Sequence, residues 1–180
     1  MIRKLLYNEI EEAISLQNRI YDNLIDKDLY IMTTPNDFYD IFEKDYLLGY
    51  FINDKLVGVL TIITNRLYEQ NLCFDCNLDY KDCYTFDAVY VDNEYRGKGI
   101  QNKLLEYGIS IAEEKNIKYI LSTVSPNNVY SHHNFELNNF IVYKQMIKYE
   151  KYLSRSKKIL IIRSEHNEPK RFSILERNRF

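Results

Sequence analysis

The sequence predicts a mixed α/β fold, in which a mostly antiparallel sheet is flanked by helices in a single domain over residues 1–163. Two observations lead to this prediction. Apolar hairpin patterns stand before and after a central strand, helix and strand, and this order of elements builds one mixed sheet. The 180-residue chain is also long enough to bury a real core, and its charged share of 28% is that of an ordinary globular protein.

The first half of the chain is predicted to contain three strands and two helices. Apolar residues recur every three or four positions over residues 9–21, which is typical of an amphipathic helix, and Gln17 lies on the same stripe. Thr34 and Pro35 have the residue types preferred at the cap and the first position of a helix, so a second helix is predicted through Phe42. The predicted strands are residues 2–6, 46–52 and 56–64.

The second half of the chain is predicted to supply the central strand, helix and strand, followed by closing strands. Residues 65–82 show no periodicity, and we interpret them as an insertion between two strands. Residues 164–180 are polar and charged, and we interpret them as a C-terminal tail. The predicted elements are strands at residues 84–91, 118–124, 141–147 and 158–162, and helices at residues 100–116 and 128–138.

The turn between strand 84–91 and the helix that follows is the most informative segment. It contains Arg96, Gly97, Lys98 and Gly99. Glycines let the backbone approach a ligand, the first turn of a helix leaves N–H groups unpaired, and two cationic side chains add charge. The turn therefore predicts a pyrophosphate site. The alternative is a pair of ordinary turn glycines, because the spacings of the P-loop and of the dinucleotide fingerprint are both missing.

Two motifs give the chain a family resemblance. The first fits an acetyl-CoA signature at Val91, Tyr95, Arg96 and Gly99, and departs from it at Asn93 and Gln101. The second has the expected spacing at Asn128, Ser131, Phe135 and Phe140, with Asn139 in place of the usual glycine. Because both motifs occur in the right order, the chain resembles the GNAT superfamily of N-acetyltransferases over about residues 45–147.

The resemblance implies where acetyl-CoA would bind. In the GNAT fold the two central strands, which here end near Val91 and Val124, splay apart and admit the cofactor. The first of them would pair with the pantetheine arm, as an added strand pairs with a sheet edge. The implied cofactor-binding residues are Val89, Tyr90, Val91, Arg96, Gly97, Lys98, Gly99, Ile100, Gln101, Asn128 and Ser131. For Asn128 a helix-capping role is equally compatible with its position.

The resemblance also implies an activity. We expect an acetyl-CoA-dependent N-acetyltransferase that transfers acetyl to a primary amine, of a small molecule or a peptide, by direct attack in a ternary complex. Residues 22–45 and 65–82 are expected to form the acceptor pocket. The alternative is a catalytically inactive CoA-binding sensor or structural module, which Phe135 and Gln101 favour.

The catalytic groups are predicted by position. Asp87 lies two residues before Val89, on the same strand face and near where the family often places a carboxylate, so we predict it as the base. The family's usual tyrosine acid is replaced by Phe135, which cannot donate a proton. Tyr130 lies within two helical turns of Phe135 and is the predicted acid. His132 and His133 are further candidates.

No metal is predicted. Cys73 and Cys76 form a CxxC pair near Cys83, but the chain has no second such pair, so we expect reduced, partly buried thiols. An odd number of cysteines also argues against a disulfide framework.

The charge distribution and the hydropathy suggest partners and location. Residues 148–180 carry ten Lys/Arg against four Asp/Glu, a balance of +6, so the rest of the chain carries −8. The acidic part is interpreted either as a solvated face or as a mouth that attracts a cationic acceptor. We expect no membrane partner, because no apolar stretch is long enough to span a bilayer. We expect no nucleic-acid partner either; the alternative is that the basic C-terminal segment binds nucleic acid or another partner. We expect a cytoplasmic protein, whose exposed closing strands would allow a homodimer.

Overall fold

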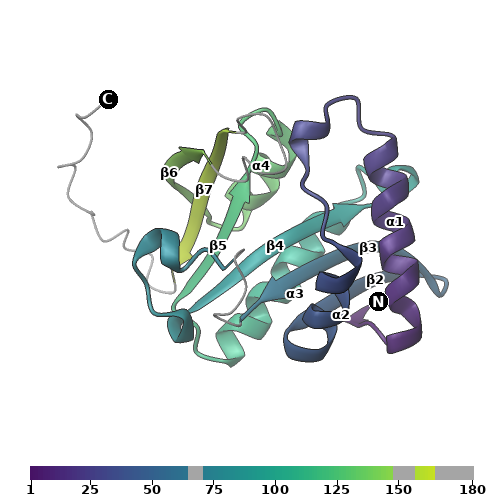
Figure 1. The fold of residues 1–180 in the computed structure, drawn as a ribbon, viewed down its shortest axis with the longest axis horizontal. Helices are drawn as coiled ribbons and strands as arrows, with labels where there is room; N and C mark the ends of the chain where they lie inside the picture. The colour runs from purple at the N-terminus through teal and green to yellow at the C-terminus, as the bar shows by residue number, and fades with distance from the viewer. Residues whose placement is uncertain (65–70, 148–156, 165–180) are drawn as a thin grey trace.

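A computed structural model describes residues 1–64, 71–147 and 157–164, which form a seven-stranded sheet with helices on both faces (Figure 1). The strand order is β1-β2-β3-β4-β5-β7-β6. Neighbouring strands are antiparallel except for β4 and β5, which are parallel. The predicted mixed, mostly antiparallel sheet is confirmed. The strands are β1 (Ile2–Lys4), β2 (Tyr46–Ile52), β3 (Lys55–Ile63), β4 (Cys83–Val91), β5 (Tyr119–Val124), β6 (Ile141–Ile147) and β7 (Lys157–Ser164).

Helices cover the sheet on both sides. α1 (Ile10–Asp22) and α2 (Pro35–Lys44) pack on one face, and α3 (Ile100–Glu114) packs on the other. α4 (Val129–Leu137) follows β5 and contacts α3. Thr34 caps α2 as predicted, because its side chain accepts a hydrogen bond from the Asp37 N–H. Of the helices described, none combines the length and the apolar character that crossing a membrane requires.

The predicted and observed elements differ mainly at their ends. β1 stops at Lys4, α2 continues to Lys44, and β7 runs on to Ser164, which pairs with Tyr119. Such ends are set by tertiary contacts and are the least certain part of a pattern-based prediction. Residues 71–82, between β3 and β4, contain two short 3₁₀ turns. Parts of the predicted insertion and tail, residues 65–70 and 165–180, lie outside the described residues.

The core has a layer on each face of the sheet. Leu60, Phe86 and Leu104 belong to the layer between the sheet and α3. Ile10 and Phe38, which are fully buried, belong to the layer between the sheet and the pair α1 and α2. Because β3 and β4 contribute to both layers, these two strands fix the helices of the two faces relative to each other.

A β-bulge at Asp87 reverses the alternation of side chains along β4. In the pairing with β3, Ala88 faces Thr61 and Phe86 faces Ile62, so Asp87 is the extra residue of the bulged strand. Before the bulge Phe86 packs in the α3 layer, whereas after it the even-numbered Ala88 packs in the opposite layer. Bulges often re-aim a side chain near a site in this way.

A glycine lets α3 approach the sheet closely. A Cβ atom on Gly108 would lie 2.8 Å from Leu60 Cδ2 and 2.8 Å from Phe86 Cζ. Both side chains are fully buried and have little room to move. The close approach brings the helix down onto β3 and β4.

We expect Gly108→Val to lower the free energy of unfolding, because its methyl groups overpack this contact, by about 1–3 kcal/mol more than Ser110→Val does. The second change places the same β-branched residue in the same helix at a partly exposed position, so it controls for helix propensity. Urea denaturation measures both. Equal losses in the two variants would contradict the close approach.

An ion pair fastens α1 to the end of β4. Arg19 Nη2 donates to Asp92 Oδ2 at 2.7 Å, and the other carboxylate oxygen accepts from the Glu94 N–H at 3.1 Å. Burial by itself would raise the pKa of Asp92, but the Glu94 N–H and the Arg19 guanidinium together lower it. Asp92 thereby anchors the turn that leads to Arg96.

We expect the stabilisation by Asp92 to depend on pH. Because the pKa of Asp92 is lowered in the fold, its contribution is complete above the ordinary carboxyl range and is lost as the pH falls through the lowered pKa. The free energy of unfolding of the wild type should therefore exceed that of Asp92→Asn most at about pH 7, and the difference should shrink below about pH 4.

Urea denaturation at several pH values measures this difference. Glu114→Gln removes an exposed carboxylate at the far end of α3 and controls for the general loss of charge. A difference between wild type and Asp92→Asn that stays constant down to about pH 2 would contradict the role of the ionised carboxylate.

Candidate active site

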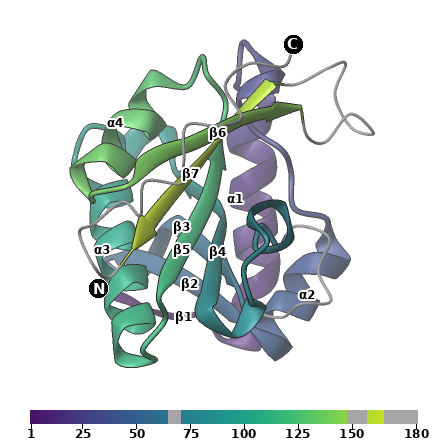
Figure 2. The same cartoon turned by 90° about the vertical axis from the view of Figure 1, so that its left-hand side faces the viewer.

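The two central strands diverge after a short parallel contact. β4 and β5 pair only at Cys83–Tyr119, Tyr84–Ile120 and Thr85–Leu121. Beyond that point β4 stays paired with β3 up to Val91, and β5 stays paired with β7 up to Val124 (Figure 2). Where the strands begin to diverge, the Ser122 hydroxyl donates to the Phe86 carbonyl at 2.8 Å and links β5 to β4. The splayed central strands that the sequence implied are confirmed.

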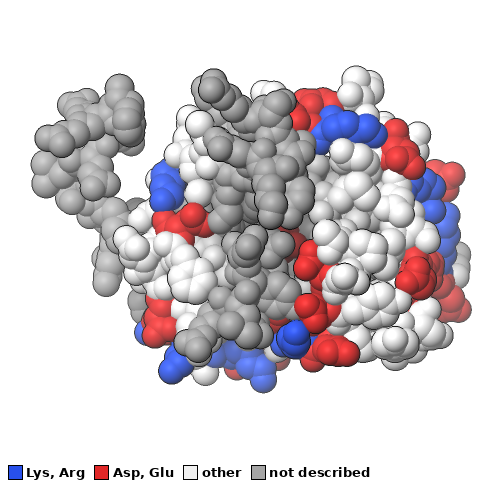
Figure 3. Space-filling view, in the orientation of Figure 1, with Lys and Arg blue, Asp and Glu red and all other residues white. Residues whose placement is uncertain are grey.

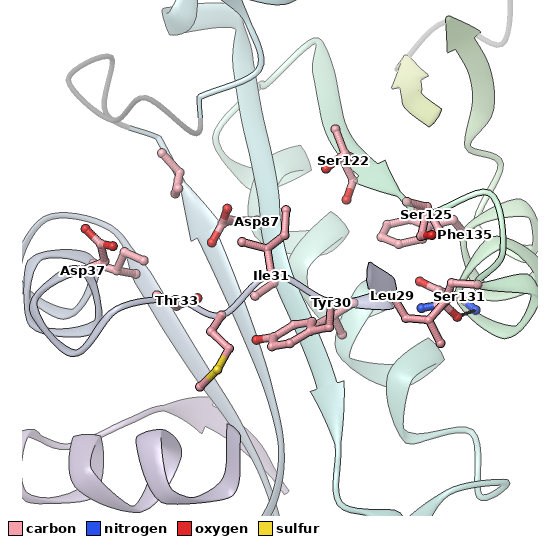
Figure 4. Close-up of a pocket in the computed structure, with 18 of the residues that line it drawn as sticks. Leu29, Tyr30, Ile31, Thr33, Asp37, Asp87, Ser122, Ser125, Ser131 and Phe135 are labelled. Atoms are coloured by element: carbon pink, nitrogen blue, oxygen red, sulfur yellow. Dashed lines mark hydrogen bonds between the residues drawn. The ribbon is translucent and has the colours of Figure 1, made fainter. Parts of the chain in front are cut away.

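A pocket of about 120 Å³ lies where the strands diverge (Figure 4). One wall is residues 29–34, which connect α1 to α2, together with Asp37 and Ile41 on α2. β4 contributes residues 87–89, and β5 and the loop after it contribute residues 122–125. Ser131 and Phe135 on α4 complete the other wall. Of the two segments expected to form an acceptor pocket, residues 22–45 contribute, whereas none of the described residues 71–82 lines it.

Asp87 lies in this pocket, at the bulge of β4. Its Oδ2 is 3.4 Å from the Thr61 hydroxyl, which also accepts a hydrogen bond from the Ala88 N–H at 2.8 Å. The prediction that Asp87 shares a strand face with Val89 is wrong, because the bulge intervenes and Val89 packs against the α3 layer. Both residues still line the pocket, since it opens beside the strand edge.

The glycine turn has the backbone geometry of an anion-binding loop. Gly97 and Gly99 have φ angles of +73° and +70°, which side chains rarely adopt, and a Cβ on either would meet nothing within 4 Å. Gly99 is the N-cap residue of α3, and no side chain caps this helix. The N–H groups of the first turn have no partner within the helix. Arg96 and Lys98 beside them are exposed.

Hydrogen bonds connect the start of α3 to α4. Gln101 Nε2 lies 3.3 Å from the Ser131 hydroxyl, and Gln101 Oε1 accepts from Asn134 Nδ2 at 3.0 Å. One turn further along, Asn138 Nδ2 donates to Asn102 Oδ1 at 2.6 Å. Gln101, where the family motif has a small residue, thus links the glycine turn to the helix that lines the pocket.

Asn128 and Ser131 lie together at the start of α4. Asn128 is the N-cap residue, and its side chain accepts from the Ser131 N–H at 3.1 Å. Both residues also line the pocket, so the capping role and a place at the site coexist. The side chain of Tyr90 turns away from the pocket, and its hydroxyl donates to the Ala13 carbonyl in α1 at 3.1 Å.

The structure does not bring the predicted acid to the pocket. Tyr130 is 82% exposed and is absent from the pocket lining. His133 is exposed, and His132 lies on another side of α4, with Nδ1 3.6 Å from a Glu136 carboxylate oxygen. Phe135 does line the pocket, and its ring packs edge-on against Phe140 at a centroid distance of 4.9 Å. Of the predicted acid and its alternatives, none lines the pocket, and Phe135, which does, cannot donate a proton.

Sequence reasoning missed some residues of the pocket. The hydroxyl residues Ser122 and Ser125 at the end of β5 line it without matching any motif, and residues 29–34 were expected there only as part of the segment 22–45. One signal was present, because Gln17 interrupts the apolar stripe of α1 and bonds to this connection. A buried amide on a helix stripe indicates a specific polar partner.

The three cysteines form a separate buried cluster. Cys73, Cys76 and Cys83 form no disulfide, and they pack with Leu72 and Leu121 at the paired end of β4 and β5. Burial raises the pKa of Cys73 and of Cys83. Within residues 1–64, 71–147 and 157–164, no group of three or more His, Cys, Asp and Glu residues could hold a metal ion.

Solved structures resemble this fold closely although their sequences differ. An N-acetyltransferase from Staphylococcus aureus Mu50 is 19% identical, with a TM-score of 0.71 over 91% of this chain and 97% of that one. A ribosomal-protein-alanine N-acetyltransferase from Brucella melitensis is 15% identical, with a TM-score of 0.72 over 91% and 99%. A putative acetyltransferase, yncA from Salmonella typhimurium, solved with acetyl-CoA, is 16% identical, with a TM-score of 0.71 over 94% and 96%.

The sequence comparison gives the family itself. Among curated proteins, none matches the chain. The model of the acetyltransferase (GNAT) family matches residues 10–140, which include α1, the pocket, the glycine turn and α4. That match covers well over half of the 180 residues. The chain belongs to the GNAT family of acetyltransferases.

Proposed function

We propose that this chain is an acetyl-CoA-dependent N-acetyltransferase that acts on a primary amine. The supporting observation is the pocket between the diverging strands, which Gln101 and Ser131 connect to the uncapped start of α3. A glycine turn alone would bind many anions, and an open pocket alone would bind many small molecules. Their connection supports a ligand with a pyrophosphate at one end and a reactive group at the other.

The residues of the turn fit the pyrophosphate of acetyl-CoA. Because a Cβ at Gly97 or Gly99 would project into open space, the two glycines leave room beside the N–H groups of α3. Arg96 and Lys98 would add positive charge. The edge of β4 beyond Thr85 is not paired with β5, so its backbone at Val89 and Val91 is available to an extended pantetheine arm. Acetyl-CoA supplies an activated thioester to this site.

Asp87 is the residue of the pocket best placed to accept a proton. An alkyl amine has a pKa near 10.4, so roughly one molecule in 2,500 is neutral at about pH 7, and direct attack on a thioester requires the neutral form. Asp87 lies on the bulge, in the pocket and within 3.4 Å of the Thr61 hydroxyl. We propose that it accepts the amine proton, directly or through water, as the amine nitrogen bonds to the acetyl carbon. The C–S bond breaks, and CoA leaves as a thiolate that takes its proton from water.

The pocket favours a cationic acceptor. Among the described residues, its lining includes two carboxylates, Asp37 and Asp87, and no Lys, Arg or His. On the face shown in Figure 3, blue Lys and Arg side chains lie mainly at the rim, whereas red Asp and Glu side chains also reach the middle. An acidic pocket of this kind raises the local concentration of an ammonium ion.

The homodimer expected from the closing strands stays a prediction.

One observation favours a second candidate, a CoA-binding module without transferase activity. Phe135 fills the place of a proton donor, is fully buried and offers only a hydrocarbon ring. A thiolate is a fair leaving group, so this residue alone does not decide between the two functions. Both candidates bind acetyl-CoA, and they differ in the release of thiol.

We expect Gly99→Glu to weaken acetyl-CoA binding at least about tenfold, because the side chain adds bulk and negative charge to the anion site. Isothermal titration calorimetry measures the affinity. Asn116→Glu is the matched control, because Asn116 also has a positive φ, of 54°, and lies just beyond the other end of α3. Unchanged affinity in Gly99→Glu, or equal losses in both variants, would refute the placement of the pyrophosphate.

We expect the wild type to release free CoA thiol from acetyl-CoA when an amine is added. A thiol-reactive dye follows this release with butylamine, 1,4-diaminobutane, lysine amide and a short peptide with a free N-terminus. The two dications, 1,4-diaminobutane and lysine amide, should react faster than butylamine. Asp87→Asn should lower kcat about a hundredfold and leave the affinity for acetyl-CoA unchanged.

Each result distinguishes the candidates. Tight acetyl-CoA binding without thiol release for any amine would favour the binding module. Thiol release that Asp87→Asn leaves at the wild-type rate would remove Asp87 from the mechanism while keeping the transferase. A faster reaction with butylamine than with 1,4-diaminobutane would contradict the cationic acceptor.

A further inference from the structure

A buried amide occupies a position where α1 should present a hydrocarbon. Gln17 lies on the stripe of α1 that faces the sheet, between Ile14 and Ile20, and is only 1% exposed. Burying an amide without hydrogen bonds costs several kcal/mol on hydrocarbon transfer scales, so such a residue needs partners. Its partners identify what the residue does.

The Gln17 side chain bonds to one short stretch of chain. Nε2 donates to the Thr33 carbonyl at 2.9 Å, and Oε1 accepts from the Thr33 N–H at 2.9 Å. Oε1 also accepts from the Tyr30 hydroxyl at 2.7 Å. The amide thus pairs with both backbone groups of Thr33, as a neighbouring strand would. Burial raises the pKa of Tyr30 well above its ordinary value, so its hydroxyl remains a donor.

The stretch that Gln17 holds is the wall of the pocket. Residues 29–34 line it, and residues 30–34, between the 3₁₀ turn Lys27–Leu29 and the start of α2, belong to no helix or strand. Within the described residues, no strand pairs with this stretch. In Figure 4, Tyr30 and Thr33 lie along the connection that crosses in front of β4, and the Tyr30 ring packs edge-on against Tyr90 at a centroid distance of 5.9 Å.

We propose that Gln17 is a positioning residue. Through Tyr30 and Thr33 it fixes the acceptor side of the pocket, the side where the acceptor amine would bind. It stands behind the wall and is absent from the pocket lining, so it acts without touching the acceptor. The donor side, where acetyl-CoA would bind, is built from other parts, namely the end of β4, the glycine turn and the start of α4. Loss of the amide should therefore impair acceptor binding and spare acetyl-CoA. This inference rests on the proposed function.

The first variant is Gln17→Leu, which keeps the approximate size and removes all three hydrogen bonds. We expect the KM for the panel amine that the wild type uses best to rise at least about tenfold, with the Kd for acetyl-CoA within about twofold of the wild type. Amide hydrogen exchange should accelerate at residues 29–34 and stay unchanged in the first turn of α3. Tyr30→Phe removes one bond of the three, so we expect a smaller rise in KM.

Two further variants separate positioning from general stability. Ile20→Ala makes a cavity in the same helix face and should leave the acceptor KM near the wild-type value. In Gln17→Glu, the protonated carboxyl offers one hydrogen-bond donor and one acceptor, whereas the ionised carboxylate offers only acceptors. The ratio of its acceptor KM to that of the wild type should therefore be near one at low pH and rise as the pH increases.

The outcomes are decisive for the proposal. The proposal would be overturned if Gln17→Leu raised the acceptor KM and the acetyl-CoA Kd equally, or left the acceptor KM unchanged. The same rise in acceptor KM in Ile20→Ala would also overturn it. A wild type that transfers acetyl to no amine of the panel would refute the proposed function instead. In that case the exchange at residues 29–34 still decides whether Gln17 holds the wall, and unchanged exchange in Gln17→Leu would overturn the positioning role.

Discussion

The constraint on which the rest of the structure depends is the divergence of β4 from β5. The two strands share three residue pairs and then separate, β4 remaining paired with β3 and β5 with β7. Parallel strands that stayed paired would leave no opening between them. The divergence creates the pocket, and the bulge at Asp87 places a carboxylate in it.

The two sides of the pocket are made by different physical means. The donor side depends on backbone geometry, since Gly97 and Gly99 adopt positive φ angles and α3 begins without a capping side chain. The proposed acceptor side depends on side-chain hydrogen bonds, since the Gln17 amide bonds to both backbone groups of Thr33. Backbone geometry tolerates many side chains nearby, whereas hydrogen bonds from one amide depend on that residue.

Local signals made most of the fold predictable. The helices and hairpins were predictable because hydrophobic period, caps and turn glycines act over a few residues, as at Thr34 and Gly99. The bulge at Asp87 was not, because it depends on the register with β3, and it reversed the face assigned to that residue. Tyr130 was placed by proximity along α4, but the phase of the helix turns Phe135 to the pocket and Tyr130 to solvent.

The cysteine cluster has a consequence of its own. All three thiols of the chain are buried, and Cys83 belongs to the first residue pair between β4 and β5. Because the thiolate is the reactive species, a thiol that is shielded and kept protonated is modified only when its surroundings open. The rate at which a soluble maleimide alkylates Cys83 therefore reports how often the closed end of the strand pair comes apart. The chain carries an intrinsic probe of the contact from which its pocket opens.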